Sequence, residues 1–107
     1  MMAAYTAAQN GADVTLFERN EKLGKKMYIS GKGRCNLTND CTPREFVDNI
    51  ATNAKFAINA LYKFPPSSTM DLCEDNGLTL KVERGNRVFP ASDKSSDVIS
   101  FFAKLVA

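Results

Sequence analysis

The sequence predicts an α/β fold, and two adjacent segments carry most of that prediction. The first residues, MMAAYTAAQN, are small helix formers that end at Gly11, which is typical of a closely packed helix followed by a turn. The residues Ala12–Arg19 (ADVTLFER) form a nearly continuous apolar run that predicts a buried strand of a parallel sheet, with Glu18 near its end. A helix, a glycine turn and such a strand make up the second half of a βαβ nucleotide-binding unit, whose first strand and glycine turn are absent.

Composition limits the function classes. The chain has 107 residues, enough for one small domain, with 44% hydrophobic residues and a net charge of +2. So small a basic excess argues against a dedicated nucleic-acid-binding protein. The chain has neither an apolar run of about 20 residues nor an N-terminal signal peptide. We therefore expect a cytoplasmic protein without a membrane partner.

The cysteine and histidine content excludes several kinds of site. The chain has three cysteines, Cys35, Cys41 and Cys73, in no CxxC pair, and it has no histidine. This pattern argues against a disulfide framework and against a metal site. Without histidine, the chain has no histidine triad or histidine general base, and no residue can be assigned as catalytic.

The rest of the chain predicts helices and one short strand. Thr42 is placed to cap a helix that has Pro43 at its first position. A second, amphipathic helix ends before Pro65. Further predicted features are a helix capped by Ser67 or Ser68, a half-exposed strand at 78–84 (LTLKVER), a turn-rich connection at 85–96 with Ser92, Asp93 and Ser95 as a helix cap, and a terminal helix at 97–107 with Val98, Phe101, Phe102 and Leu105 on its apolar side.

Two features are candidate ligand contacts. A carboxylate at the position of Glu18 can accept hydrogen bonds from both hydroxyls of an adenosine ribose, although it can equally be a surface carboxylate. The loop Gly31-Lys32-Gly33-Arg34-Cys35-Asn36 allows close backbone approach at its two glycines. Its Arg34 offers paired donors to a phosphate and Asn36 offers an amide. Alone, such a loop is also consistent with a plain glycine turn, and Cys35 with a small residue that fills it.

The basic residues between Lys22 and Arg34 suggest an alternative from another class. They could bind phosphate or RNA as part of a small non-catalytic α/β module. Acidic residues flank this run and Tyr28 is its only aromatic residue, so a nucleic-acid partner is not expected. Steep loss of RNA affinity with salt would distinguish this alternative from cofactor binding.

The segment from Gly11 to Asp40 closely resembles a family of bacterial FAD-dependent oxidoreductases that includes aminoacetone-oxidase-like and bile-acid-inducible members. The resemblance rests on a strand that ends in Glu18, on Leu23-Gly24-Lys25-Lys26, and on Ser30–Asn39 (SGKGRCNLTN) without a gap. A later block, 86–98 (NRVFPASDKSSDV), is also similar, with Asn86 where the family usually has glycine. The resemblance covers essentially the whole chain.

The resemblance implies a partial Rossmann-like FAD-binding domain, a substrate that the sequence does not identify, and a use of NAD(P)H that it leaves open. Glu18 would hold the adenosine ribose, with Arg19 near the adenine. The remaining implied FAD contacts are Lys26, Ser30, Gly31, Gly33, Arg34, Cys35 and Asn36.

The resemblance also implies that the chain is a fragment with one incomplete domain. Residues 1–40 would be the partial βαβ unit and flavin loop, and residues 41–107 a helical segment, short strand and terminal helix. We expect such a chain to bind FAD weakly or not at all and to be inactive alone. An unpaired Val14–Phe17 strand would expose a sheet edge and favour self-association.

Overall fold

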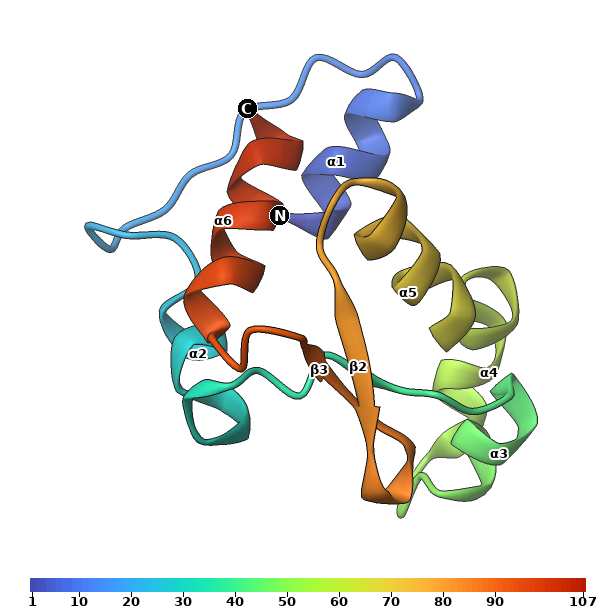
Figure 1. Ribbon diagram of the computed structural model, residues 1–107. Coiled ribbons are helices and arrows are strands. Elements are labelled where there is room, and N and C mark those ends of the chain that lie inside the picture. The colour runs from blue at the N-terminus through green and yellow to red at the C-terminus, as the bar shows by residue number, and fades with distance from the viewer.

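The computed structural model describes all 107 residues, and its centre is a small antiparallel sheet. Strand β3 (Arg87–Pro90) lies between β1 (Thr38–Asn39) and β2 (Leu80–Glu83), as Figure 1 shows. Val88 is the pairing partner of Thr38 on one side and Val82 on the other. The predicted β2 strand is confirmed. The prediction of a turn-rich connection was wrong at β3, because pairing along both edges is a tertiary property that local composition does not report.

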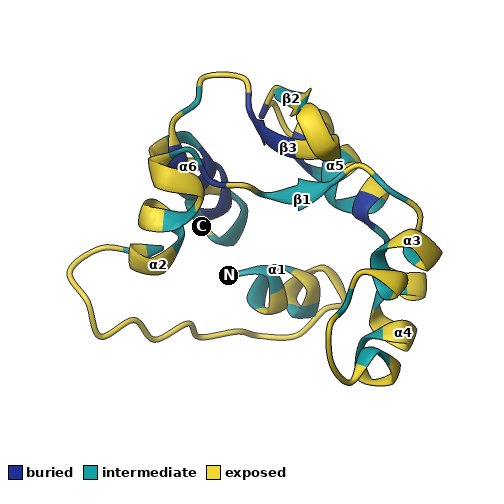
Figure 2. Ribbon diagram, turned by 90° about the horizontal axis from the view of Figure 1, so that it is seen from below, coloured by how far each residue is buried: buried dark blue, intermediate teal, exposed yellow.

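The hydrophobic core cluster lies against the terminal helix α6 (Ser95–Val106) and includes Cys35, Cys73 and Leu78 from other parts of the chain. Figure 2 shows buried segments in α6, in β3 and in helix α5 (Pro66–Asp75). Val98, Phe101 and Phe102 of α6 are buried in one cluster, and Leu105 packs against it. The predicted apolar side of this helix is therefore confirmed.

Three helices follow β1: α3 (Pro43–Asp48), α4 (Ala54–Lys63) and α5 (Pro66–Asp75). Thr42 caps α3 as predicted, because its hydroxyl accepts a 3.2 Å hydrogen bond from the Glu45 amide and the Glu45 carboxylate accepts one from the Thr42 amide at 2.8 Å. The predicted serine cap of α5 is wrong. Pro65 precedes this helix and Pro66 occupies its first position, where the missing N–H costs nothing.

The N-terminal third departs most from prediction. Helix α1 (Met2–Gln9) forms as expected, but Ala12–Arg19 is an exposed extended segment without a strand partner, so the predicted parallel strand is wrong here. A strand is stable only when neighbouring strands pair with its backbone N–H and C=O groups, and no strand pairs with this segment. Residues Met27–Ile29 belong to a short helix, α2 (Lys25–Ile29), for which no prediction was made.

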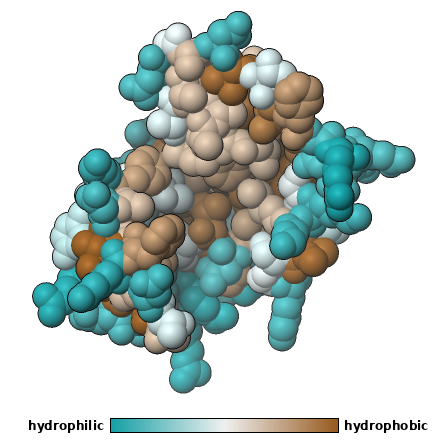
Figure 3. Space-filling model, turned by 180° about the vertical axis from the view of Figure 1, so that it is seen from behind, coloured by the Kyte–Doolittle hydropathy of each residue, from teal (hydrophilic) through white to brown (hydrophobic).

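Many large apolar side chains reach the surface. Phe17 is 91% exposed and Phe56 on α4 is 86% exposed. Figure 3 shows apolar side chains over several separate parts of one face, between hydrophilic ones. Exposed apolar area favours association, so self-association remains a prediction, now based on these side chains rather than on a sheet edge.

None of the six α-helices combines the length and the apolar character that crossing a bilayer requires.

Candidate functional site

A hollow of about 690 Å³ brings together three of the residues singled out from the sequence: Glu18, Arg19 and Lys26. Met1, immediately before helix α1, also lines it. Its walls further include apolar side chains, such as Phe17. The hollow thus combines one carboxylate, three cationic side chains (Lys25 as well as Arg19 and Lys26) and the N-terminal end of a helix, whose backbone N–H groups favour anions.

The orientation of Glu18 is set by Asn20, a residue that the sequence analysis did not consider. One carboxylate oxygen of Glu18 accepts hydrogen bonds from the Asn20 backbone N–H at 2.9 Å and from its side-chain amide at 2.7 Å. These bonds, the backbone one first, hold the pKa of the Glu18 carboxyl below its ordinary value. Glu18 is therefore ionised at neutral pH, and its second oxygen remains available to a ligand.

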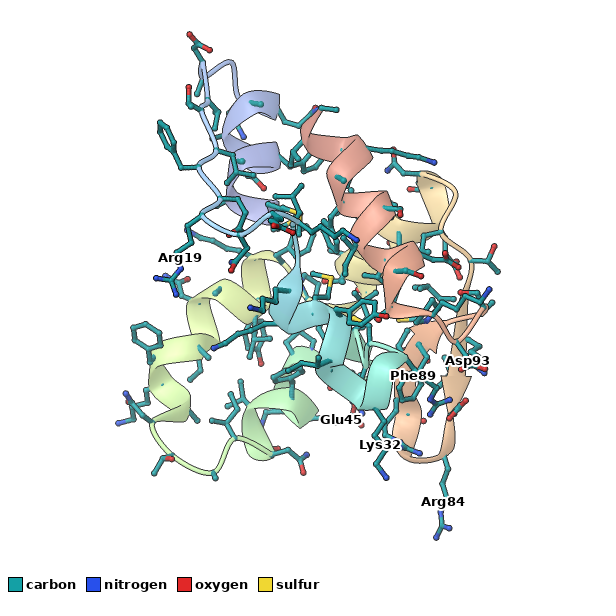
Figure 4. All side chains as sticks on the ribbon, turned by 90° about the vertical axis from the view of Figure 1, so that its left-hand side faces the viewer. Arg19, Lys32, Glu45, Arg84, Phe89 and Asp93 are labelled. Carbon is teal, nitrogen blue, oxygen red and sulfur yellow. The ribbon has the colours of Figure 1, made fainter.

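The predicted loop follows α2, and Ile29, the last residue of that helix, still lines the hollow. Lys26 is in the helix and Ser30 directly follows it, with the Ser30 hydroxyl donating to the Met27 carbonyl at 2.8 Å. Figure 4 shows Arg19 on the opposite side of the molecule from Lys32 and Phe89. The structure therefore places the predicted contacts partly in the hollow and partly in the loop that follows α2, rather than in one pocket.

The loop Ser30–Asn36 has a tightly folded backbone. Gly31, Lys32, Gly33 and Cys35 all have positive φ angles, between 56° and 84°. A Cβ atom on Gly31 would lie 2.6 Å from the Asn36 nitrogen and 3.3 Å from the Phe89 ring, so only glycine fits there. Asn36 is exposed, and its backbone N–H has no backbone partner in the chain. The loop thus offers a free N–H and an exposed amide.

Cys35 faces inward. Its side chain is buried in the core cluster with Cys73 and the α6 phenylalanines. Burial raises the pKa of the Cys35 thiol above its ordinary value, which disfavours the reactive thiolate. The interpretation of Cys35 as a small residue that fills the loop agrees with this placement, and the side chain faces away from any ligand on the surface.

Arg34 faces the sheet. Its guanidinium binds both carboxylate oxygens of Glu83, at 2.8 and 3.0 Å, and one oxygen of Asp93 at 2.9 Å. It also stacks on the ring of Phe89, with the guanidinium carbon 3.9 Å from the ring centre. Lys81 completes the cluster, with its ammonium 2.6 Å from Asp93 and 3.1 Å from Glu83.

This ionic cluster corrects the predicted cap of α6. Asp93 pairs with Arg34 and Lys81, while Ser95 donates to the Tyr28 carbonyl at 2.8 Å, and no side chain caps the helix. Glu83, Phe89 and Asp93 were not identified as site residues from the sequence. Phe89 and Asp93 lie in the block 86–98, which is similar to the flavoprotein family. Local sequence patterns do not show the contacts with Arg34, because Glu83 is 49 residues and Asp93 is 59 residues away along the chain.

Comparison with known proteins identifies the family to which this chain belongs. The family model described as "HI0933-like protein Rossmann domain" matches residues 1–107, the whole chain. The chain belongs to this family. HI0933-like proteins are FAD-binding oxidoreductases with a Rossmann domain, so the resemblance inferred from Ser30–Asn39 is confirmed, as is the partial Rossmann-like α/β fold class.

Individual relatives of this HI0933-like chain have different activities. It is 34% identical over 101 residues to a 3-dehydro-bile acid delta(4,6)-reductase of Clostridium scindens, which covers 92% of this chain and 24% of the relative. It is also 29% identical over 90 residues to a ribosomal RNA dihydrouridine synthase of Haemophilus influenzae (83% and 22%) and 33% identical over 79 residues to that of Escherichia coli (73% and 19%). The chain thus spans about a fifth to a quarter of these relatives.

Proposed function

We propose that this chain forms part of the FAD site of a flavin-dependent oxidoreductase and contacts the adenosine, the pyrophosphate and the adjoining part of the cofactor. The observation that carries the proposal is the hollow lined by Glu18, Arg19 and Lys26 at the start of α1. Its polar groups suit the cofactor. A carboxylate can accept hydrogen bonds from a ribose diol, and cations at a helix N-terminus can bind a pyrophosphate.

Each side chain has a distinct task in this proposal. Glu18, held ionised by Asn20, accepts hydrogen bonds from the ribose hydroxyls. Lys26 balances phosphate charge, and Arg19 lies beside the adenine. The Gly31–Gly33 backbone approaches the cofactor closely, while Asn36 offers its free N–H and its amide to polar atoms further along the cofactor. Bound FAD itself would supply the electron-transfer chemistry.

No substrate follows from the comparisons, because the names of the relatives include both a bile acid and ribosomal RNA. The alternative of a phosphate- or RNA-binding module gains no support from the geometry. Arg34, at the end of the basic run, is neutralised by two carboxylates rather than free for a phosphate backbone.

The first experiment is a titration of the purified chain with FAD, followed by flavin absorbance and fluorescence. We expect weak saturable binding that ADP competes away and that FMN does not reproduce, because the contacts at the hollow are to the adenosine half. Glu18→Ala should abolish this binding. Glu21→Ala is the matched control, since Glu21 does not line the hollow.

Two results would contradict the proposal for this chain. One is the absence of saturable FAD binding. The other is binding that FMN reproduces and that Glu18→Ala leaves unchanged, which would place the ligand elsewhere. RNA binding that falls steeply with salt would favour the alternative module.

A further inference from the structure

The strongest unassigned feature is the ionic cluster beneath the Ser30–Asn36 loop, formed by Arg34, Lys81, Glu83 and Asp93 over Phe89. Two positive and two negative side chains balance within it. The Arg34–Glu83 contact is bidentate, and the side chains of the pair are only 31% and 29% exposed. An isolated surface ion pair contributes little to stability, but a bidentate pair within a network on a buried ring has fixed geometry.

The cluster is built on the sheet, so it is rigidly placed relative to the core. Lys81 is opposite Phe89 in the register of β2 and β3, and Glu83 is two residues further along the same strand. Phe89 is 2% exposed, and its ring is the nearest side chain to the position where Gly31 lacks a Cβ atom. Phe89 therefore supports the loop at two points, under Gly31 and under the Arg34 guanidinium.

The loop needs such support because its conformation is strained. Lys32 and Cys35 adopt left-handed backbone angles, with φ of 57° and 59°, which are unfavourable for a residue with a Cβ atom. Two consecutive side chains anchor this backbone in different directions. Arg34 binds the cluster on the sheet, and Cys35 enters the core. On either side of these two residues in the sequence, Gly31, Gly33 and Asn36 are exposed.

We infer that Glu83, Asp93 and Phe89 are positioning residues for the proposed cofactor site: they bind Arg34 and so hold the Ser30–Asn36 loop in its ligand-ready conformation. Arg34 then acts as the anchor of the loop rather than as a counter-charge for phosphate. The inference rests on the proposed function for its link to FAD. Its structural half, the anchoring of the loop, stands on the contacts alone.

The experiment measures two properties of the full chain in Arg34→Gln, Glu83→Gln and Asp93→Asn. The first is hydrogen exchange at the amides of Arg34 and Cys35, which bond to the Gly31 and Ser30 carbonyls within the loop. The second is FAD affinity. Arg44→Lys is the matched control, because Arg44 pairs with Asp48 on the exposed surface of α3. The Leu78 amide, bonded to the Cys73 carbonyl, reports global opening.

We expect exchange at the two loop amides to rise roughly tenfold in each cluster variant, with the Leu78 amide changed much less. FAD affinity should fall by a similar factor. In the double variant Arg34→Gln/Glu83→Gln, affinity should be little lower than in either single variant, because both residues act through one contact. Arg44→Lys should change neither property.

Other results overturn the inference. If Arg34 binds phosphate directly, Glu83→Gln frees the cation and keeps or tightens FAD binding, while Arg34→Gln abolishes it. Unchanged loop exchange in the cluster variants overturns the anchoring itself. A chain that binds no FAD, yet whose loop amides exchange faster in the variants, contradicts the proposed function and supports the anchoring.

Discussion

The hydroxyl of Ser95 donates a 2.8 Å hydrogen bond to the carbonyl of Tyr28, 67 residues earlier in the chain. Ser95 is 2% exposed, at the first position of α6. This bond joins the terminal helix to α2, which connects the hollow around Glu18 to the Ser30–Asn36 loop. The relative position of the two proposed contact areas therefore depends in part on this buried serine.

Ser95→Ala should lower the free energy of unfolding by about 1 kcal/mol, because the bond between the buried Ser95 hydroxyl and the Tyr28 carbonyl is lost. Urea unfolding measures this difference. Ser96→Ala is the control, since Ser96 is the next residue on the same helix and is exposed; its effect should stay within about 0.5 kcal/mol. Equal effects of the two variants would show that the Ser95 bond contributes nothing specific.

Gly31→Ala should destabilise the chain more than Gly33→Ala. Both glycines have positive φ, 56° and 84°, so alanine is strained at both by roughly 1–2 kcal/mol. Only at Gly31 would the added Cβ also meet backbone, 2.6 Å from the Asn36 nitrogen, whereas nothing lies within 4 Å of it at Gly33. Urea unfolding should separate the two variants by about 1 kcal/mol or more. Indistinguishable midpoints would mean that the loop relaxes freely.

Acid should weaken the fold through the ionic cluster. The hydrogen bond from Arg34, followed by that from Lys81, lowers the pKa of the Glu83 carboxyl to about 2, and bonds from Lys81 and Arg34 lower the pKa of Asp93. Carboxyls with a lowered folded-state pKa stabilise the fold above their unfolded pKa, about 4, and lose that contribution as pH falls through the folded value.

We therefore expect the free energy of unfolding to fall between about pH 5 and pH 2. Glu83→Gln should flatten this part of the profile. Glu74→Gln is a suitable comparison, because Glu74 is exposed on α5 and forms no ion pair. A profile that keeps its full slope in Glu83→Gln would show that other carboxyls cause the acid sensitivity.

The three thiols should differ in reactivity. Cys35 and Cys73 are buried, and burial raises the pKa of Cys73 to about 11, whereas Cys41 is partly exposed. Since the thiolate is the reactive form and must be accessible, a thiol-specific disulfide reagent at pH 8 should titrate Cys41 first. The other two should react only after addition of urea. Cys41→Ser should remove the fast phase, and rapid reaction of all three thiols would contradict the buried placement.

The FAD contacts proposed from the sequence differ in how the structure arranges them. Glu18, Arg19 and Lys26 do line one hollow. The predicted phosphate contact of Arg34 stays a prediction, and the structure adds a competing set of partners for its guanidinium. The sequence shows that Arg34 is a hydrogen-bond donor in a glycine loop. It does not show that the acceptor is Glu83, 49 residues later in the chain.

The sequence by itself determined the family and most of the helices, and it is the source of the proposed ligand contacts. Helices α1, α3, α4 and α6 follow from local features, such as the Thr42 capping box and the spacing of Val98, Phe101 and Phe102, because helix hydrogen bonds close within four residues. The Ser30–Asn39 motif identified the flavoprotein family for the same reason, since it is one continuous segment.

Only the tertiary structure decided the strands and the partners of the loop. Ala12–Arg19 has a strand-like composition and no partner, while Arg87–Pro90 looks like a connection and is the central strand. A strand depends on hydrogen bonds to distant segments, which single-segment patterns do not contain. The anchoring of Arg34 by Glu83 and Asp93 depends on the same long-range pairing, because β2 and β3 place both carboxylates beside the loop.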